Sequence, residues 1–177
     1  FISMESHGLR DKALKAIDNT DFYPAKGKDR IRAMIETRPD WCVSRQRVWG
    51  VPLPIFISKK TGEVLVDDNV FENIAKIYEK EGSDCWFNED YQPFLGDKYR
   101  AEDYEKLSDI VEVWFDSGST HSFVLEKRDD LKWPASMYLE GSDQHRGWFH
   151  SSLLESCGTR GVAPFESILS HGFVVDG

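Results

Sequence analysis

The chain has 177 residues, of which 40% are hydrophobic and six are tryptophan, a composition typical of a globular domain and not of a disordered segment. The formal net charge of −9 argues against a nucleic-acid platform over most of the surface; the basic excess of residues 1–66 could favour phosphates or be an ordinary solvated face. No apolar run approaches 18 residues and the three cysteines form no C-x-x-C pair, so we expect no membrane span, disulfide framework or zinc ribbon, and a reducing cytoplasm as the location.

The first part of the chain predicts two helices separated by an extended segment. Apolar residues share one face of a short helix from Leu9 to Ile17. Residues 22–25 are expected to be extended, because the residue before a proline avoids the helical region. A second helix is predicted from Asp29 to Glu36, with Pro39 to end it.

A basic segment follows between two tryptophans. Arg45 and Arg47 flank Gln46, and an extended apolar run occupies residues 51–57. The guanidinium groups could stack on Trp41 or Trp49, which is a structural role, or contact a phosphate-bearing partner.

Residues 58–110 are acidic and have the pattern of an insertion. Residues 59–63 predict a hairpin turn with Gly62 at positive φ, and residues 70–78 predict an amphipathic helix that Gly82 ends. The aromatic residues between 85 and 95 are interpreted as a local core. No catalytic constellation is visible in this segment.

Alternation of apolar and polar residues over 111–115 predicts a strand that opens into a polar glycine turn at 116–120. Asp116, Ser117, Ser119 and His121 could suggest a hydrolase. The G-x-S-x-G elbow is absent, however, and we reject a nucleophilic triad on that ground.

A second strand and polar turn lie at residues 137–144, followed by a predicted helix from Gln144 to Leu154. Asp143 can accept hydrogen bonds from a ribose diol, and Gln144 can bind an amino-acid ammonium or carboxyl group. Trp148 lies one helical turn after Gln144 and could form an apolar wall beside it. The alternative is that Asp143 caps the helix and Trp148 belongs to the core.

A further strand and turn at residues 168–175 complete a strand–helix–strand crossover with parallel strands, for which a right-handed connection is expected. His171 would then lie at the same carboxyl edge of the sheet as Glu140, where open α/β sheets bind ligands. A structural histidine is the alternative.

Four ordered segments of the chain resemble isoleucyl-tRNA synthetases, a family of class I aminoacyl-tRNA synthetases. They are RPDWCVSRQRVWGVP at residues 38–52, VWFDSGST at 113–120, GSDQHRGW at 141–148 and SHGFVVDG at 170–177. The resemblance implies an α/β fold, the second half of a class I Rossmann-like nucleotide-binding fold with a parallel sheet and an inserted small α+β connective subdomain. Residues 1–57 would be a connector and catalytic-domain segment after the editing domain, 58–110 the insertion, and 111–177 the C-terminal half of the catalytic domain.

The resemblance also implies a reaction and roles for particular residues. Isoleucine would be activated by ATP, with Mg²⁺, to isoleucyl-adenylate and transferred to tRNA(Ile), without a covalent enzyme nucleophile and without metal ligands in this chain. Trp114 and Trp148 would shape the isoleucine pocket, Gln144 would bind the amino group, and Gly141 and Asp143 would lie at the ribose. Glu140 would contact the adenylate, His171 would pack toward the adenine, and Arg45 or Arg47 could contact the tRNA acceptor end.

The family's two ATP signatures, HIGH and KMSKS, are absent from these 177 residues, and both ends of the sequence resemble cuts in a larger protein. We therefore expect this chain alone to be inactive, with an exposed sheet edge, and the full-length protein to be a soluble monomer. The alternatives are a class I synthetase for valine or leucine, and a non-enzymatic paralogous binding module.

Overall fold

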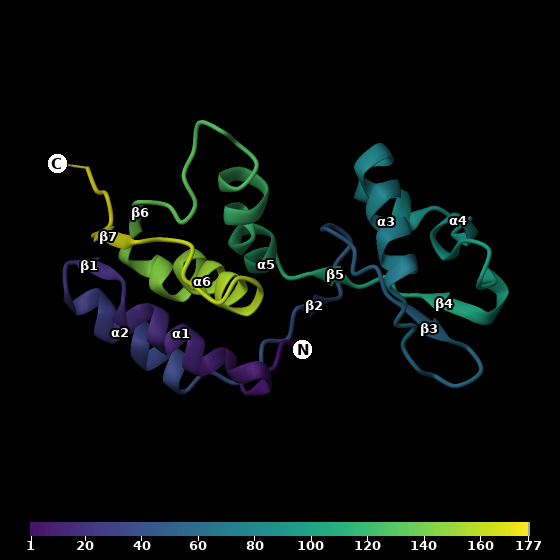
Figure 1. The fold of residues 1–177 in the computed structure, drawn as a ribbon, viewed down its shortest axis with the longest axis horizontal. Helices are drawn as coiled ribbons and strands as arrows, with labels where there is room; N and C mark the ends of the chain where they lie inside the picture. The colour runs from purple at the N-terminus through teal and green to yellow at the C-terminus, as the bar shows by residue number, and fades with distance from the viewer. Residues whose placement is uncertain (177) are drawn as a thin grey trace. The chain divides into compact units, whose positions relative to one another are not determined.

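The computed structural model describes residues 1–176; Gly177, the last residue of the predicted 111–177 segment, lies outside them. The described chain forms two compact units (Figure 1). One unit joins Phe1–Val43 to the chain from Val113 onward, and the other is Ser44–Glu112. The second unit thus includes more of the chain at both ends than the predicted 58–110 insertion. The assignment of these segments to a connector, an insertion and half of a catalytic domain stays a prediction.

The first unit contains a three-stranded parallel sheet in the order β1-β7-β6. Its strands are β1 (Asp21–Tyr23), β6 (Tyr138–Gly141) and β7 (Ser167–His171). In the register of the sheet, Ile168 lies between Phe22 and Tyr138, and all three of these side chains are buried. The predicted parallel α/β architecture and the extended segment at 22–23 are therefore confirmed.

Two helices near the start of the chain carry apolar stripes as predicted. The first, α1 (Leu9–Asp18), buries Leu9, Ala13, Ala16 and Ile17. The second, α2 (Lys26–Glu36), buries Ile31 and Ile35 and begins three residues earlier than Asp29. The two helices lie side by side (Figure 1), and α1 also packs against α6 (Trp148–Thr159).

The helix α6 is the central element of this unit. Every residue from 149 to 157 is buried, including serines, a histidine and a glutamate, so α6 shows no clear polar face. A helix surrounded by protein on all sides is expected to lack the amphipathic pattern of a surface helix.

One face of the sheet remains open. Tyr23 and Leu139 lie on either side of Leu169 in the same row of the sheet, and their side chains are 54% and 55% exposed. Parallel sheets are ordinarily covered on both faces. The core of this unit is therefore built on the other face, which buries Phe22, Tyr138 and Ile168.

The predicted strand over residues 111–115 is wrong. Only β5 (Ile110–Val111) is extended, and it pairs with β2 (Ser44–Arg45) in the second unit; the chain then turns into the helix α5 (Val113–Gly118). Helix α5 packs closely against α6, and the Phe115 ring lies 6.0 Å from the Trp41 ring, measured between centroids. Tertiary packing thus outweighs a five-residue alternation, which is too short to distinguish a strand from a helix.

The second unit has its own small core. Strands β3 (Phe56–Ser58) and β4 (Tyr104–Lys106) pair antiparallel, and α3 (Asp68–Glu81) and α4 (Gln92–Leu95) pack beside them. The core consists of Phe56, Val70, Ile74, Cys85, Trp86, Phe94 and Leu95. The predicted helix and its glycine end are confirmed, with Gly82 at φ +80°, and so is the turn glycine Gly62 at φ +74°. The aromatic residues between 85 and 95 include core members, as predicted.

Among residues 1–176, none of the helices has both the length and the apolar character needed to cross a lipid bilayer.

Candidate functional site

The structure contains the sheet edge at which the sequence predicts that a ligand binds. Glu140 pairs with Ser170 and Gly141 with His171, at the carboxyl ends of β6 and β7. A Cβ atom at Gly141 would lie 2.6 Å from Asp143 Oδ1 and 3.9 Å from His171 Cε1. Glu140, Asp143 and His171 are all exposed. The edge therefore presents two carboxylates and an imidazole to solvent in a small area.

The histidine at this edge is exposed rather than part of the core. Its Nδ1 lies 2.6 Å from the carbonyl oxygen of Gly172. A carbonyl oxygen only accepts, so a neutral His171 carries its proton on Nδ1 and leaves Nε2 as an acceptor. The role of His171 at the adenine, with a structural histidine as the alternative, stays a prediction.

The predicted helix from Gln144 to Leu154 begins later than expected. Ser142–Arg146 forms a 3-10 turn, η5, and α6 starts only at Trp148. Gly147 separates the two with φ −115° and ψ −117°, outside the helical region. A Cβ atom at Gly147 would lie 2.4 Å from Gln144 Oε1 and 2.9 Å from Trp114 Cη2, so only glycine fits there without displacement.

Gln144, and not Asp143, caps α6. Its Oε1 accepts a hydrogen bond from the backbone N–H of Trp148 at 2.9 Å, and its Nε2 donates to Asp143 Oδ2 at 3.1 Å. The orphan donors at a helix N-terminus require such an acceptor. An amide oxygen has two lone pairs, so Oε1 keeps one for a second donor while it caps the helix.

The two predicted pocket tryptophans meet at this helix start. Trp114 lies on α5, not on a strand, and its ring approaches Gly147 closely. The Trp148 ring stacks on Tyr138 at 4.0 Å with an interplanar angle of 2°, and its Nε1 donates to the Ser117 carbonyl at 3.0 Å. Trp148 is half-buried and Trp114 is 41% exposed, so both rings keep free surface.

Two groups that the sequence did not single out hold this arrangement. The Tyr138 ring stacks on the Trp148 ring, and the Tyr138 hydroxyl lies 3.1 Å from Ser152 Oγ on α6. His145, a residue of η5, is buried, with Nδ1 2.7 Å from the Ser142 carbonyl and its ring edge-on to Phe149. Burial lowers the pKa of His145, so it is a neutral structural group. Only its place inside the polar turn could have drawn attention to it.

His150 on α6 is a second buried imidazole near the site. Burial, with a smaller contribution from the positive charge of Arg38, lowers the pKa of His150 to about 3. A neutral His150 contributes no charge to the site at neutral pH.

The cluster of Asp116, Ser117, Ser119 and His121 does not form a triad. Ser117 Oγ donates to the Trp114 carbonyl, Ser119 Oγ donates to the Asp116 carbonyl, and His121 Nδ1 donates to the Gly118 carbonyl. The two hydroxyls thus serve their own helical turn. The rejection of a nucleophilic triad is supported by this geometry.

The two candidate tRNA-binding arginines lie in the second unit. Arg45 Nη1 donates to the Ser44 carbonyl at 2.8 Å, and Arg47 Nη1 donates to the Gln46 carbonyl at 3.0 Å. The guanidinium that lies over the Trp41 ring is that of Arg38, at 5.3 Å. Trp49 is almost fully exposed. The structure therefore shows a cation–π contact at Trp41, but with a different arginine, and the tRNA role of Arg45 and Arg47 stays a prediction.

Comparison with known proteins defines the class to which this chain belongs. A family model described as tRNA synthetases class I (I, L, M and V) matches residues 1–177, and the chain therefore belongs to the class I tRNA synthetases. Its parallel sheet with flanking helices is consistent with the Rossmann-like fold expected of that class.

Within this class, the chain is similar to isoleucine–tRNA ligases. The chain is 84% identical over all of its 177 residues to the isoleucine–tRNA ligase of Pelagibacter ubique (strain HTCC1062), of which it covers 20%. It is 59% identical over 169 residues to the isoleucine–tRNA ligase of Zymomonas mobilis and 54% identical over 175 residues to that of Caldicellulosiruptor bescii. Each of these two matches spans 96% of the chain, but only 18% and 19% of the respective relative's length. The resemblance inferred from the four motifs is confirmed, and the chain spans about a fifth of the length of these relatives.

Proposed function

We propose that this chain is part of an isoleucine–tRNA ligase and forms the surface that binds the isoleucyl and ribose portions of isoleucyl-adenylate. The observation that carries the proposal is the meeting of Trp114, Gln144 and Trp148 at the start of α6, beside the polar edge of the sheet. The 84% identity to an isoleucine–tRNA ligase supports isoleucine over valine or leucine as the substrate.

The reaction has two steps and needs no enzyme nucleophile. The isoleucine carboxylate attacks the α-phosphorus of ATP, and pyrophosphate leaves. A hydroxyl of the terminal ribose of tRNA(Ile) then attacks the activated carbonyl carbon, and AMP leaves. Rate enhancement in such a reaction comes from positioning and from stabilisation of charge on the phosphate oxygens.

The side chains of the site match the parts of the adenylate. The exposed surfaces of Trp114 and Trp148 provide apolar walls for the aliphatic side chain. The second lone pair of Gln144 Oε1 accepts a hydrogen bond from the ammonium group, since an ammonium group only donates. The Asp143 carboxylate accepts hydrogen bonds from the ribose hydroxyls. Glu140 contacts the adenylate and Gly141 lies at the ribose, and His171 packs toward the adenine.

An apolar pocket of this kind discriminates weakly between homologous side chains. One methylene group is worth about 1–3 kcal/mol, or about 10- to 200-fold, and isoleucyl-tRNA synthetases are the standard illustration of this limit. We therefore expect valine to be activated as well, at a lower rate.

Mg²⁺ is expected to accompany ATP in this reaction. Residues 1–176 bring together no group of three His, Cys, Asp or Glu side chains with metal-binding geometry. The roles of Arg45 and Arg47 at the tRNA acceptor end belong to the same proposal and rest on the resemblance alone.

The experiment that tests the proposed function is isoleucine-dependent exchange of pyrophosphate into ATP by the full-length protein that contains this chain. We expect the rate of exchange at saturating isoleucine to be well above the rates at saturating valine and at saturating leucine. Preference for valine or leucine would favour a different synthetase, and no exchange with any of the three would favour a non-enzymatic module. The chain of 177 residues alone is expected to catalyse no exchange.

A further inference from the structure

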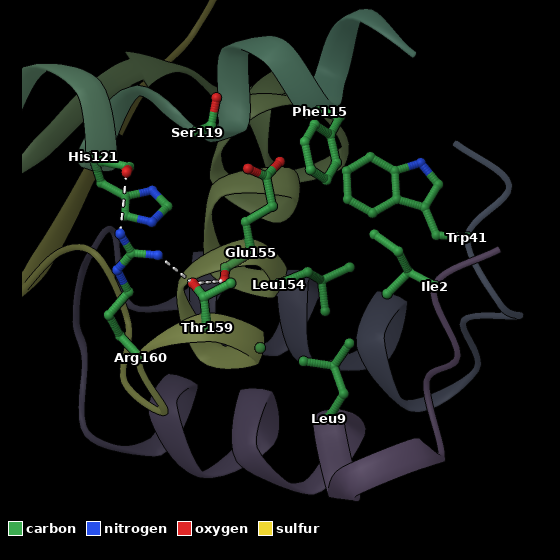
Figure 2. A pocket seen from close by; sticks show the side chains of 12 residues that line it. Ile2, Leu9, Trp41, Phe115, Ser119, His121, Leu154, Glu155, Thr159 and Arg160 are labelled. Carbon is green, nitrogen blue, oxygen red and sulfur yellow. Dashed lines mark hydrogen bonds between the residues drawn. The ribbon is translucent and has the colours of Figure 1, made fainter. Parts of the chain in front are cut away.

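A second pocket lies in the first unit, beside the C-terminal half of α6, and none of the proposed adenylate-binding residues lines it. Its volume is about 390 Å³, which lies in the range of pockets that hold small organic molecules. Figure 2 shows apolar side chains along one side of it, contributed by Ile2, Leu9, Trp41, Phe115 and Leu154. This side of the pocket therefore suits an apolar body such as an aromatic ring.

Another side of the pocket carries a buried imidazole with an unused acceptor. His121 is 1% exposed, and its Nδ1 lies 3.0 Å from the Gly118 carbonyl oxygen. Because a carbonyl oxygen only accepts, Nδ1 carries the proton and Nε2 is an acceptor. Burial lowers the pKa of His121, which keeps this neutral form at neutral pH. Within residues 1–176, His121 Nε2 has no hydrogen-bond partner, and in Figure 2 the ring extends toward the interior of the pocket.

The arginine that lines the pocket is held by other partners. Arg160 donates to both carboxylate oxygens of Glu126, at 2.9 and 2.8 Å, and to the hydroxyls of Ser122 and Thr159. A bidentate arginine–carboxylate pair is geometrically specific and holds the guanidinium in place. The charge of Arg160 is therefore largely balanced by Glu126, and the pocket has no strong preference for an anion on its account.

The remaining polar side chains around the apolar wall also have partners. The Ser119 hydroxyl donates to the Asp116 carbonyl at 2.8 Å, and the Thr159 hydroxyl donates to the Glu155 carbonyl at 2.6 Å. Glu155 itself lines the pocket and has an interaction partner within the chain. The imidazole of His121 is therefore the group at which a hydrogen-bond donor of a ligand is best placed.

We propose that this pocket binds a small neutral molecule with a hydroxyl group on an apolar body, of the chemical class of phenols and small apolar alcohols. The hydroxyl donates to His121 Nε2, and the body packs against Trp41 and Leu154.

Other ligand chemistries fit this pocket less well. A hydrocarbon of the same shape would leave the Nε2 lone pair without a donor, which is costly in a buried site. A carboxylate has no proton to donate to Nε2. An ammonium group would exchange its hydration shell for a site in which one acceptor is without a donor of its own at His121, although it carries three donors.

The pocket and the proposed isoleucine walls use different parts of the same two helices. Helix α6 carries Trp148 at its first residue and Leu154 six residues later, a rise of about 9 Å along the axis. Helix α5 carries Trp114 toward Gly147 and Phe115 toward Trp41. We therefore expect the pocket to accept its ligand whether or not isoleucine is bound.

The test uses the full-length protein and three probes: phenol, fluorobenzene and benzylamine. Phenol and fluorobenzene are nearly equal in size, but only phenol can donate a hydrogen bond. Titration followed by ligand NMR should show phenol binding about 10-fold or more tightly than either of the others, because an unsatisfied buried acceptor costs about that factor or more. Equal affinity for fluorobenzene, or tighter binding of benzylamine, would overturn the proposed ligand chemistry.

A repeat of the phenol titration with saturating L-isoleucine distinguishes this pocket from the isoleucine site. Unchanged phenol affinity supports the separate pocket. Loss of phenol binding assigns the phenol to the isoleucine site and overturns the proposal.

Two variants locate the site, with a matched control. His121→Asn can keep an N–H for the Gly118 carbonyl but removes Nε2, so the preference for phenol over fluorobenzene should disappear. Ile2→Phe should block the pocket by volume and abolish phenol binding, so the test does not depend on His121→Asn folding. Leu139→Phe adds volume at an exposed position of the same unit and should leave phenol affinity unchanged.

The proposal is refuted if the phenol preference survives in a folded His121→Asn protein, if phenol affinity is unchanged in a folded Ile2→Phe protein, or if the unaltered protein binds no phenol. None of these readouts requires isoleucine activation. Failure of the proposed function would therefore be seen separately, in pyrophosphate exchange.

Discussion

At Gly147 the chain leaves the 3-10 turn and enters α6, and the space of a Cβ atom is already occupied by Gln144 Oε1 and the Trp114 ring. Both neighbours belong to the proposed isoleucine pocket. The residue with no side chain therefore determines how closely the amide and the indole can approach each other.

Replacing Gly147 by alanine should damage the site more than the fold. The methyl group displaces Gln144 and Trp114, at a cost of about 1–3 kcal/mol for overpacking. We expect isoleucine affinity in the full-length protein to fall about 10-fold or more, measured as the KM for isoleucine in pyrophosphate exchange. Gly158→Ala is the matched control, because Gly158 lies in α6 and its added Cβ would meet only Leu9 Cδ1, at 3.7 Å. That variant should keep the KM and gain about 0.5–1 kcal/mol of stability.

Gln144 combines a structural and a proposed binding role, and substitution should reveal both. Gln144→Ala removes the cap on Trp148 N–H, which costs about 1 kcal/mol of unfolding free energy, and removes the acceptor for the isoleucine ammonium. We expect the KM for isoleucine to rise by about 10-fold or more while the KM for ATP changes little. An unchanged KM for isoleucine in a protein that shows the stability loss would leave Gln144 with the capping role alone.

At the scale of an element, α3 depends on Asp67 at its N-terminus. Asp67 Oδ1 accepts from the backbone N–H of Asn69 at 2.9 Å, and Oδ2 accepts from Lys98 and from the Tyr99 hydroxyl, the latter at 2.8 Å. The hydrogen bonds from Lys98, and then from Tyr99, hold the pKa of Asp67 well below its usual range. This one carboxylate joins the start of α3 to the segment around residue 98.

The lowered pKa of Asp67 predicts a pH dependence for the second unit. A carboxyl group whose pKa is lower when folded stabilises the fold above its unfolded pKa, near 4, and loses that contribution as the pH falls through the folded value. We expect the thermal midpoint of the second unit to fall between pH 5 and pH 2. Asp67→Asn should lower the midpoint at pH 7 and weaken this pH dependence; melting curves followed by Trp86 fluorescence would measure it. A midpoint at pH 7 that is unaffected by Asp67→Asn would contradict this role.

The elements that sequence predicts well are those whose local signals agree with their packing. The strand at 138–141 begins with apolar residues and leads into a polar turn. Helix α3 has an apolar stripe, a capping aspartate and a terminal glycine. The strand expected at 111–115 fails because the packing of Phe115 and Gly118, which no local pattern reveals, draws those residues into α5. The start of α6 is misplaced for a similar reason: the backbone angles of Gly147 and the cap by Gln144 are visible only in three dimensions.

At the scale of the molecule, the first unit brings the strand ends of β6 and β7 to one edge, as the crossover pattern predicts. The clustering of Glu140, Asp143 and His171 could be anticipated from that rule, and their roles come from the resemblance. The pocket around His121 and Glu155 could not be anticipated, because its lining residues range from Ile2 to Arg160 and none of them belongs to a local motif that points to a cavity.

The sheet of the first unit is also incomplete by the usual rule for parallel sheets. The row of Tyr23, Leu169 and Leu139 is open to solvent at both ends, and β1 and β6 are edges. We therefore expect the isolated chain to self-associate through this apolar surface at high concentration, which sedimentation velocity would measure. Replacing Leu139 by lysine should suppress that association, and a monodisperse monomer of the unaltered chain at all concentrations would contradict the expectation.

The most direct test of the central claim is the structure of the full-length protein bound to a non-hydrolysable isoleucyl-adenylate analogue. The account predicts the isoleucine side chain against Trp114 and Trp148, its ammonium within hydrogen-bond distance of Gln144 Oε1, and the ribose at Asp143. An analogue bound away from the start of α6, or one whose ammonium is held by other residues while Gln144 only caps the helix, would contradict it.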